Sequence, residues 1–71
     1  MIDKAWRHMA SRLAHEIRVN LSTPSSFATF AGPMNWYNGW LYPAVIGGLP
    51  LLSMEEARTL SDEEIWDRVM I

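Results

Sequence analysis

The stretch that decides the fold reads Met34-Asn35-Trp36-Tyr37-Asn38-Gly39-Trp40-Leu41-Tyr42-Pro43, with two Trp and two Tyr within seven positions. It lies inside a longer segment, residues 19–54, that contains no Lys, Arg, Asp, Glu or His. Every charged side chain of this 71-residue chain therefore lies in its two ends. The ends must either cover the aromatic stretch or leave it displayed, so its local structure sets the fold class.

One interpretation of the stretch is a β-hairpin. Asn38-Gly39 between aromatic residues is a strong hairpin signal, and it would pair Tyr37 with Trp40 and Trp36 with Leu41. However, a proline on each side limits the arms to a few residues, and an isolated hairpin of that length is only marginally stable.

The other interpretation is a helix over residues 34–42. Pro33 would open this helix and Pro43 would close it, because a residue before proline is restricted away from helical geometry. One helical face would then gather the large side chains of Trp36, Tyr37, Trp40 and Leu41. We favour the helix, so the sequence predicts a helical middle.

Residues 3–19 predict an amphipathic helix. Its apolar residues fall on one broad face: Ile2, Ala5, Trp6, Met9, Ala10, Leu13, Ala14 and Ile17. The opposite face is polar and largely basic: Lys4, Arg7, His8, Ser11, Arg12, His15 and Arg18. We expect the apolar face to pack on the uncharged middle, and Arg18 to complement the dipole at the helix C-terminus.

A second, short helix is predicted over residues 24–31. Pro24 suits the first helical position, and Gly32-Pro33 suits a stop just past the end. Phe27 and Phe30, three residues apart, would share one face of this helix.

Residues 43–52 predict an irregular connection. Gly47-Gly48 and Pro50 exclude a helix here, and the other residues are mostly apolar. We therefore expect an extended segment that is largely buried against the helices.

The C-terminal end repeats one pattern eight residues apart, in which a Ser is followed three residues later by a Glu. This pattern predicts two capping boxes, Ser53 with Glu56 and Ser61 with Glu64. It therefore predicts one short helix over residues 54–60 and another over residues 62–70.

Composition bounds the class of protein. A chain of this length forms one domain near the lower size limit for a single core, and 49% hydrophobic residues with four Trp permit dense packing. The lack of Cys excludes disulfides and fits a reducing compartment, and the charged N-terminus lacks the apolar run of a secretory signal, so we expect a cytoplasmic protein.

The two ends differ in charge. Residues 1–18 carry four Lys or Arg against two acidic residues, whereas residues 55–71 carry six acidic residues against two Arg. A basic N-terminal helix and an acidic tail attract each other, so we expect the tail to fold back near the basic side of that helix.

No residue pattern predicts catalysis. There is no Cys, no phosphate-binding glycine loop and no nucleophile motif. His8 and His15 are seven residues apart, roughly 10.5 Å along a helix, which is too far for them to share one metal ion. We expect a protein that is not an enzyme, with no catalytic residue, no cofactor and no metal.

Two binding classes remain as alternatives. The basic face of the first helix, formed by Lys4, Arg7, His8, Arg12 and His15, could follow a phosphate backbone, although the whole chain is acidic. Residues 34–52 are uncharged and aromatic at one end, but their prolines and glycines argue against spanning a bilayer, which leaves a membrane-peripheral small subunit.

The sequence as a whole predicts a mostly all-α protein. Residues 1–71 would form a single small helical domain, a bundle of one long N-terminal helix, several short helices and an irregular apolar connection. Its expected function is non-catalytic protein–protein interaction, as a small adaptor or inhibitor of the kind that phages and mobile elements carry. It would dock on a larger protein, or on a second copy, through Trp36, Tyr37, Trp40 and Tyr42.

Overall fold

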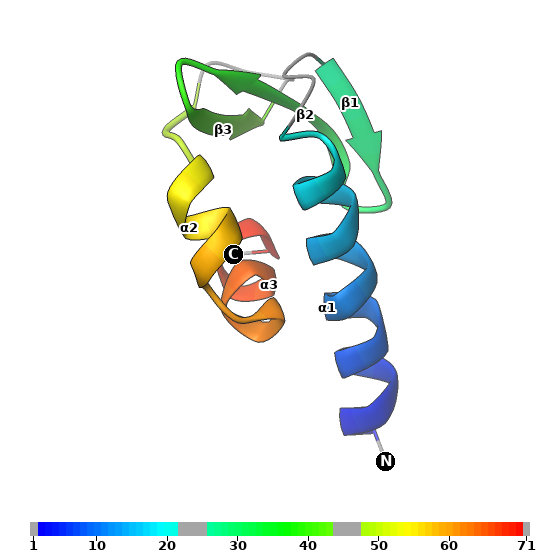
Figure 1. The fold of residues 1–71 in the computed structure, drawn as a ribbon. Helices are drawn as coiled ribbons and strands as arrows, with labels where there is room; N and C mark the ends of the chain where they lie inside the picture. The colour runs from blue at the N-terminus through cyan, green and yellow to red at the C-terminus, as the bar shows by residue number, and fades with distance from the viewer. Residues whose placement is uncertain (1, 22–25, 44–47, 71) are drawn as a thin grey trace.

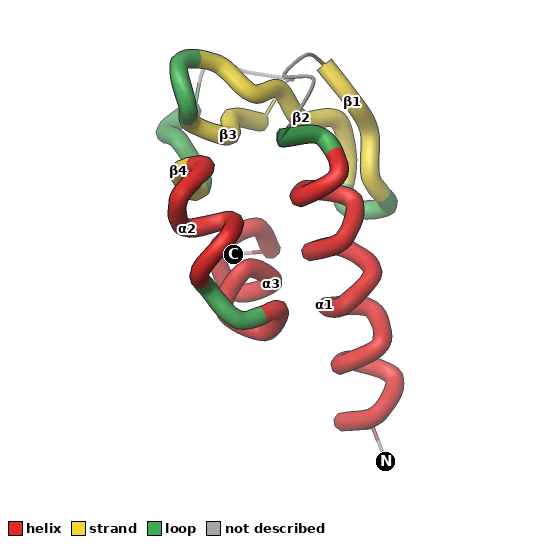
Figure 2. The backbone as a smooth tube through the Cα atoms, viewed as in Figure 1, coloured by secondary structure: helices red, strands yellow, loops and turns green. Residues whose placement is uncertain are grey.

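The computed structural model describes residues 2–21, 26–43 and 48–70 (Figure 1). In chain order its elements are α1 (Ile2–Val19), β1 (Ser26–Thr29), β2 (Gly32–Tyr37), β3 (Trp40–Pro43), β4 (Leu52–Ser53), α2 (Met54–Thr59) and α3 (Asp62–Met70). The strands form one antiparallel sheet in the order β1-β2-β3-β4. The predicted all-α bundle is therefore wrong, because the fold is α+β. Figure 2 shows the sheet as a layer at one end of the molecule, with the helices on one side of it.

The aromatic stretch is a β-hairpin. β2 and β3 pair Tyr37 with Trp40 and Trp36 with Leu41, which is the register of the hairpin interpretation. Asn38 and Gly39 form the turn with φ angles of 53° and 81°, as a type I′ turn requires. The favoured helix over residues 34–42 is wrong because β1 and β4 extend the short hairpin on both sides into a four-stranded sheet.

The segment predicted as a helix over residues 24–31 is instead a strand, β1, followed by a turn, where the structure describes it. β1 pairs with β2 through a turn at Phe30 and Ala31, in which the Ala31 N–H donates to Thr29 Oγ1 at 3.0 Å. Gly32, which suited a helix stop, instead begins β2 with a φ of 119°. Pro24, the predicted first residue of that helix, lies outside the described residues.

The helices at the two ends follow the sequence prediction. α1 spans Ile2–Val19 and buries Ala10, Leu13, Ala14 and Ile17 completely. Leu13, Ala14 and Ile17 pack in one core cluster with apolar side chains from the sheet and the other helices, namely Met34, Trp36, Leu41, Leu52, Ala57 and Ile65. At the edge of the apolar face Met9 is 44% exposed, so the buried stripe is narrower than predicted.

Both predicted capping boxes are confirmed. At α2 the Ser53 N–H donates to Glu56 Oε1 at 2.9 Å and the Glu56 N–H donates to Ser53 Oγ at 3.1 Å. Ser61 and Glu64 make the same reciprocal pair at 2.9 and 3.2 Å at α3. Each Ser thus satisfies a backbone donor that a helix start leaves unpaired.

The connection before β4 is only partly buried. Leu52 is buried and pairs with Leu41, as an apolar connection predicts. Residues 48–50 are exposed instead, and Leu49 has 85% of its surface accessible. The prediction of a largely buried connection is therefore wrong at 48–50, and residues 44–47 lie outside the described part.

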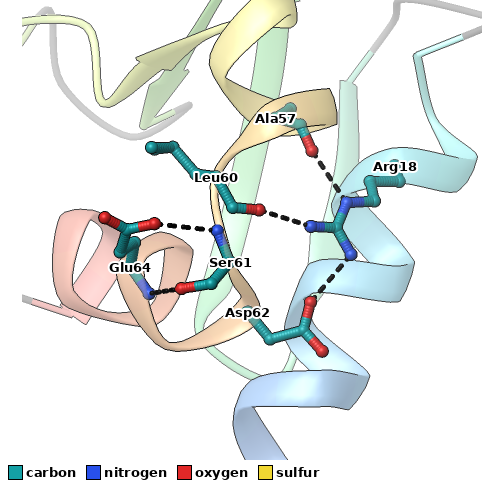
Figure 3. Close-up of polar contacts among 6 residues, drawn as sticks. All are labelled: Arg18, Ala57, Leu60, Ser61, Asp62 and Glu64. Atoms are coloured by element: carbon teal, nitrogen blue, oxygen red, sulfur yellow. Dashed lines mark hydrogen bonds and ion pairs between the residues drawn. The ribbon is translucent and has the colours of Figure 1, made fainter.

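Arg18 connects the C-terminal end of α1 to the other two helices through hydrogen bonds (Figure 3). Its guanidinium donates to the carbonyl oxygens of Ala57 at 2.7 Å and Leu60 at 2.9 Å, and to Asp62 Oδ1 at 2.8 Å. The acidic tail lies beside α1, but it packs there through the core that Ile65 shares with Leu13 and Ile17, and not on the predicted basic side. Arg18–Asp62 is the direct ion pair between them among the described residues.

Candidate functional site

The sheet has a buried inner face and an open outer face. Side chains alternate across a strand, so burial of Met34, Trp36 and Leu41 turns their neighbours outward. The outer face consists of Ser26, Ala28, Pro33, Asn35, Tyr37, Trp40 and Tyr42, which are exposed or half-buried. None of these residues is charged. An open antiparallel sheet usually turns polar side chains to water, so this face is unusual.

Three aromatic rings form what we call the aromatic patch, defined as Tyr37, Trp40 and Tyr42. Tyr37 is 62% exposed and lies directly opposite Trp40, which is 43% exposed. The Tyr42 ring meets the Tyr37 ring edge-on, with centroids 6.4 Å apart and an interplanar angle of 62°. Three of the four predicted partner-binding residues thus lie together at the turn end of the β2–β3 hairpin.

The fourth, Trp36, points the other way. It is 3% exposed and lies in the core, because strand alternation separates it from Tyr37. A helix would have placed both on one face, which is why the sequence interpretation grouped them. Among the described residues the indole N–H of Trp36 has no hydrogen-bond partner, which is a cost that the burial of its ring must offset.

The predicted basic face lies on the solvent side of α1. Its five members, Lys4, Arg7, His8, Arg12 and His15, are all exposed. Within the described ranges, ion pairs form at Arg18–Asp62 and at Arg68–Glu56, the latter at 3.0 Å, and neither uses a residue of this face. Among the side chains that the structure describes, at residues 4–21, 26–43 and 48–70, the basic face therefore has no acidic partner.

A groove lies between α1 and the turn that joins β1 to β2. It has a volume of about 230 Å³ and is lined by His8, Met9, Arg12 and Phe30. Met9 and Phe30 are 44% and 47% exposed, so they give the groove an apolar floor with a basic side.

Sequence reasoning missed this groove. It placed Met9 in the core stripe and Phe30 on a short helix. The signal that could have revealed Phe30 is Gly32-Pro33, read as the start of a strand after a turn instead of a helix stop.

The described residues hold neither a metal-binding cluster nor a helix that could span a membrane. They contain no group of three or more His, Asp or Glu side chains that could hold a metal ion. Among these same residues, no helix combines the length and the apolar character needed to cross a bilayer.

The chain matches no protein-family model, no curated protein and no solved structure in the comparisons made. Functional inference therefore rests on the surfaces described above.

Proposed function

We propose that the protein is a non-catalytic binding protein that docks on a larger intracellular protein through the outer face of its sheet. The aromatic patch is the anchor of this contact. Docking of this kind makes the protein an adaptor, or an inhibitor that occludes a surface of its partner.

The observation that carries the proposal is the exposure of Tyr37 opposite Trp40 on a sheet face without charge. Trp and Tyr are enriched among the few residues that supply most of the binding energy at protein interfaces. Depletion of charge at the centre is a second property of such interfaces. The outer face of the sheet has both properties, and no other described element covers it.

The shape of the patch also suits docking. Tyr37 and Trp40 lie on adjacent strands whose backbones are fixed by the hydrogen bonds between them. Little conformational freedom is therefore lost when a partner binds. The phenol and indole groups combine a large apolar surface with one polar atom each, which suits an interface that is partly wet.

The test begins with a photo-crosslinking amino acid at Tyr37, followed by identification of the captured partner by mass spectrometry. Affinity for the purified partner is then measured with Trp40→Thr and Tyr37→Thr, which retain a residue that favours strands. Each variant should raise the Kd by roughly 30-fold or more, as loss of a hot-spot residue does. Ala28→Thr on β1 is the matched control, because it changes the same face outside the aromatic patch, and it should bind like the wild type.

Two results would contradict the proposal. If Trp40→Thr and Tyr37→Thr bind the partner as tightly as Ala28→Thr does, the patch is not the anchor. If both instead lose their far-UV circular dichroism, the rings serve the fold. Light scattering at two concentrations separates a foreign partner from a second copy, because self-docking would double the mass of 8.2 kDa.

A further inference from the structure

We infer that the groove between α1 and the β1–β2 turn is a second binding site, which accepts an acidic amphipathic segment of another polypeptide. It is independent of the proposed function, because it uses other residues. Phe30 precedes β2, whereas Tyr37 ends it, so about 17 Å of strand separates the two sites.

The floor of the groove suits an apolar anchor. Met9 and Phe30 line the groove, and each is nearly half exposed. The Phe30 ring lies 6.0 Å from the ring of Trp66, which in turn meets the Trp6 ring edge-on at 6.4 Å. These ring contacts connect the β1–β2 turn, which carries Phe30, to α3 and α1. An apolar side chain placed on Met9 and Phe30 would remove both from water.

The side of the groove suits carboxylates. Lys4, His8 and Arg12 follow one another at intervals of four residues. They therefore form one row along α1 that spans about 12 Å. His8 and Arg12 line the groove itself, and none of the three takes part in an ion pair within the described ranges. Glu16 follows one turn after Arg12, but it is half-buried, so the exposed charge of this row is positive.

The combination favours a polypeptide over a nucleic acid. A phosphate backbone would use the cationic row and leave the apolar floor uncovered, whereas an amphipathic helix places acidic and apolar side chains side by side. The chain also carries a net charge of −2, with six acidic residues in its last 17, and this repels a polyanion more than a short acidic peptide.

The experiment uses the full chain and a labelled synthetic helical peptide with a row of Leu flanked by Glu. Fluorescence anisotropy gives its Kd, and two control peptides replace Glu by Gln or Leu by Ser. Arg12→Glu and Phe30→Ser should each weaken binding about tenfold or more, because one reverses a contacting charge and the other removes the floor. Arg58→Glu is the matched control, since it makes the same change in net charge at an exposed position of α2.

Several results would overturn the inference. Equal weakening by Arg58→Glu and Arg12→Glu would reduce the effect to net charge. Equal binding of the Gln peptide or of the Ser peptide would remove the need for an acidic or an apolar partner. A single-stranded oligonucleotide that binds more tightly, and does so regardless of Phe30→Ser, would assign the surface to nucleic acid. A wild-type dimer that Arg12→Glu converts to monomer would assign it to a second copy.

Two measurements keep the result interpretable. If Phe30→Ser does not fold, amide chemical-shift changes on adding the peptide to the wild type must centre on His8, Met9 and Arg12, and changes elsewhere refute the site. Trp40→Thr should leave peptide binding unchanged, so failure of this site and failure of the aromatic patch are distinguishable.

Discussion

Replacement of Arg18 by Met should destabilise the protein strongly, although no residue of a proposed binding site changes. The guanidinium serves three acceptors that belong to α2, to the α2–α3 connection and to α3: the Ala57 and Leu60 carbonyls and the Asp62 carboxylate (Figure 3). Met keeps the aliphatic part of the side chain but donates no hydrogen bond. The substitution therefore removes the polar connection between α1 and the C-terminal helices.

The size of the loss follows from the exposure of these groups. The Arg18 and Asp62 side chains are each 34% exposed, so the ion pair contributes no more than about 1 kcal/mol. Each carbonyl bond contributes about 1 kcal/mol, which is less than the roughly 1.5–3 kcal/mol typical of a charged donor, because water can replace the guanidinium in part. We expect Arg18→Met to lower the free energy of unfolding by about 2–3 kcal/mol, against a total on the order of 4–10 kcal/mol for a domain of this size.

Urea unfolding, followed by Trp fluorescence and by circular dichroism, measures this loss as a shift of the midpoint at constant slope. Arg18→Lys should lose most of the same energy, since an ammonium cannot match the fork of a guanidinium. Arg7→Met, an exposed position on the same helix, should stay within about 0.5 kcal/mol of the wild type. If Arg18→Met and Arg7→Met unfold at the same midpoint, the three contacts do not stabilise the fold and the reasoning is wrong.

Two further predictions concern the hairpin turn and the first capping box. Gly39→Ala should lower the free energy of unfolding in urea by about 1 kcal/mol. The φ of 81° at Gly39 strains any residue with a side chain, although no atom lies within 4 Å of an added Cβ. An unchanged midpoint would contradict the turn geometry. The hydrogen bond that Arg68 donates to Glu56 is the main cause that lowers the pKa of this carboxyl group. The hydrogen bond from the Ser53 backbone N–H lowers that pKa further. A pKa that is lower in the folded state stabilises the protein above the unfolded value and loses this effect as pH falls through the folded value. The melting temperature of the wild type should therefore drop between about pH 5 and pH 3. The Glu56→Gln variant should show a smaller drop and should be less stable than the wild type at neutral pH. Parallel curves of melting temperature against pH for the two proteins would refute the linkage.

The two ends of the chain could be predicted from the sequence because their signals are local. The apolar period of α1 needs no partner to be recognised, and each capping box joins residues only three apart. These elements appear in the structure close to their predicted bounds. The charge asymmetry predicted a tail near the basic side of α1. Among the described side chains the tail instead packs on the apolar face of α1 and pairs with its polar face only at Arg18.

The middle could not be assigned in the same way because its stability is not local. A hairpin with four-residue arms is marginal alone, and what stabilises it is pairing with β1 on one side and with Leu52-Ser53 on the other. Leu52 is eleven residues from Leu41 along the chain, and the intervening prolines and glycines gave no strand signal. The same error affected the predicted site, because a helix would have exposed Tyr37 and Trp36 together. In the strand, alternation exposes Tyr37 and buries Trp36.

The aromatic patch is larger than the needs of the fold explain. A cross-strand pair such as Tyr37 and Trp40 adds roughly 0.2–1 kcal/mol to a sheet, and a pair of Thr would supply part of that without exposing apolar surface. Met34, Trp36 and Leu41 already bury the inner face against α1, so the outer rings are not required to close the core. Exposed aromatic rings on an uncharged sheet favour unwanted association, which charged side chains on a sheet normally prevent. The small gain in stability does not offset that hazard, whereas the proposed binding role of Tyr37 and Trp40 gives a reason for exposed aromatic rings at these positions.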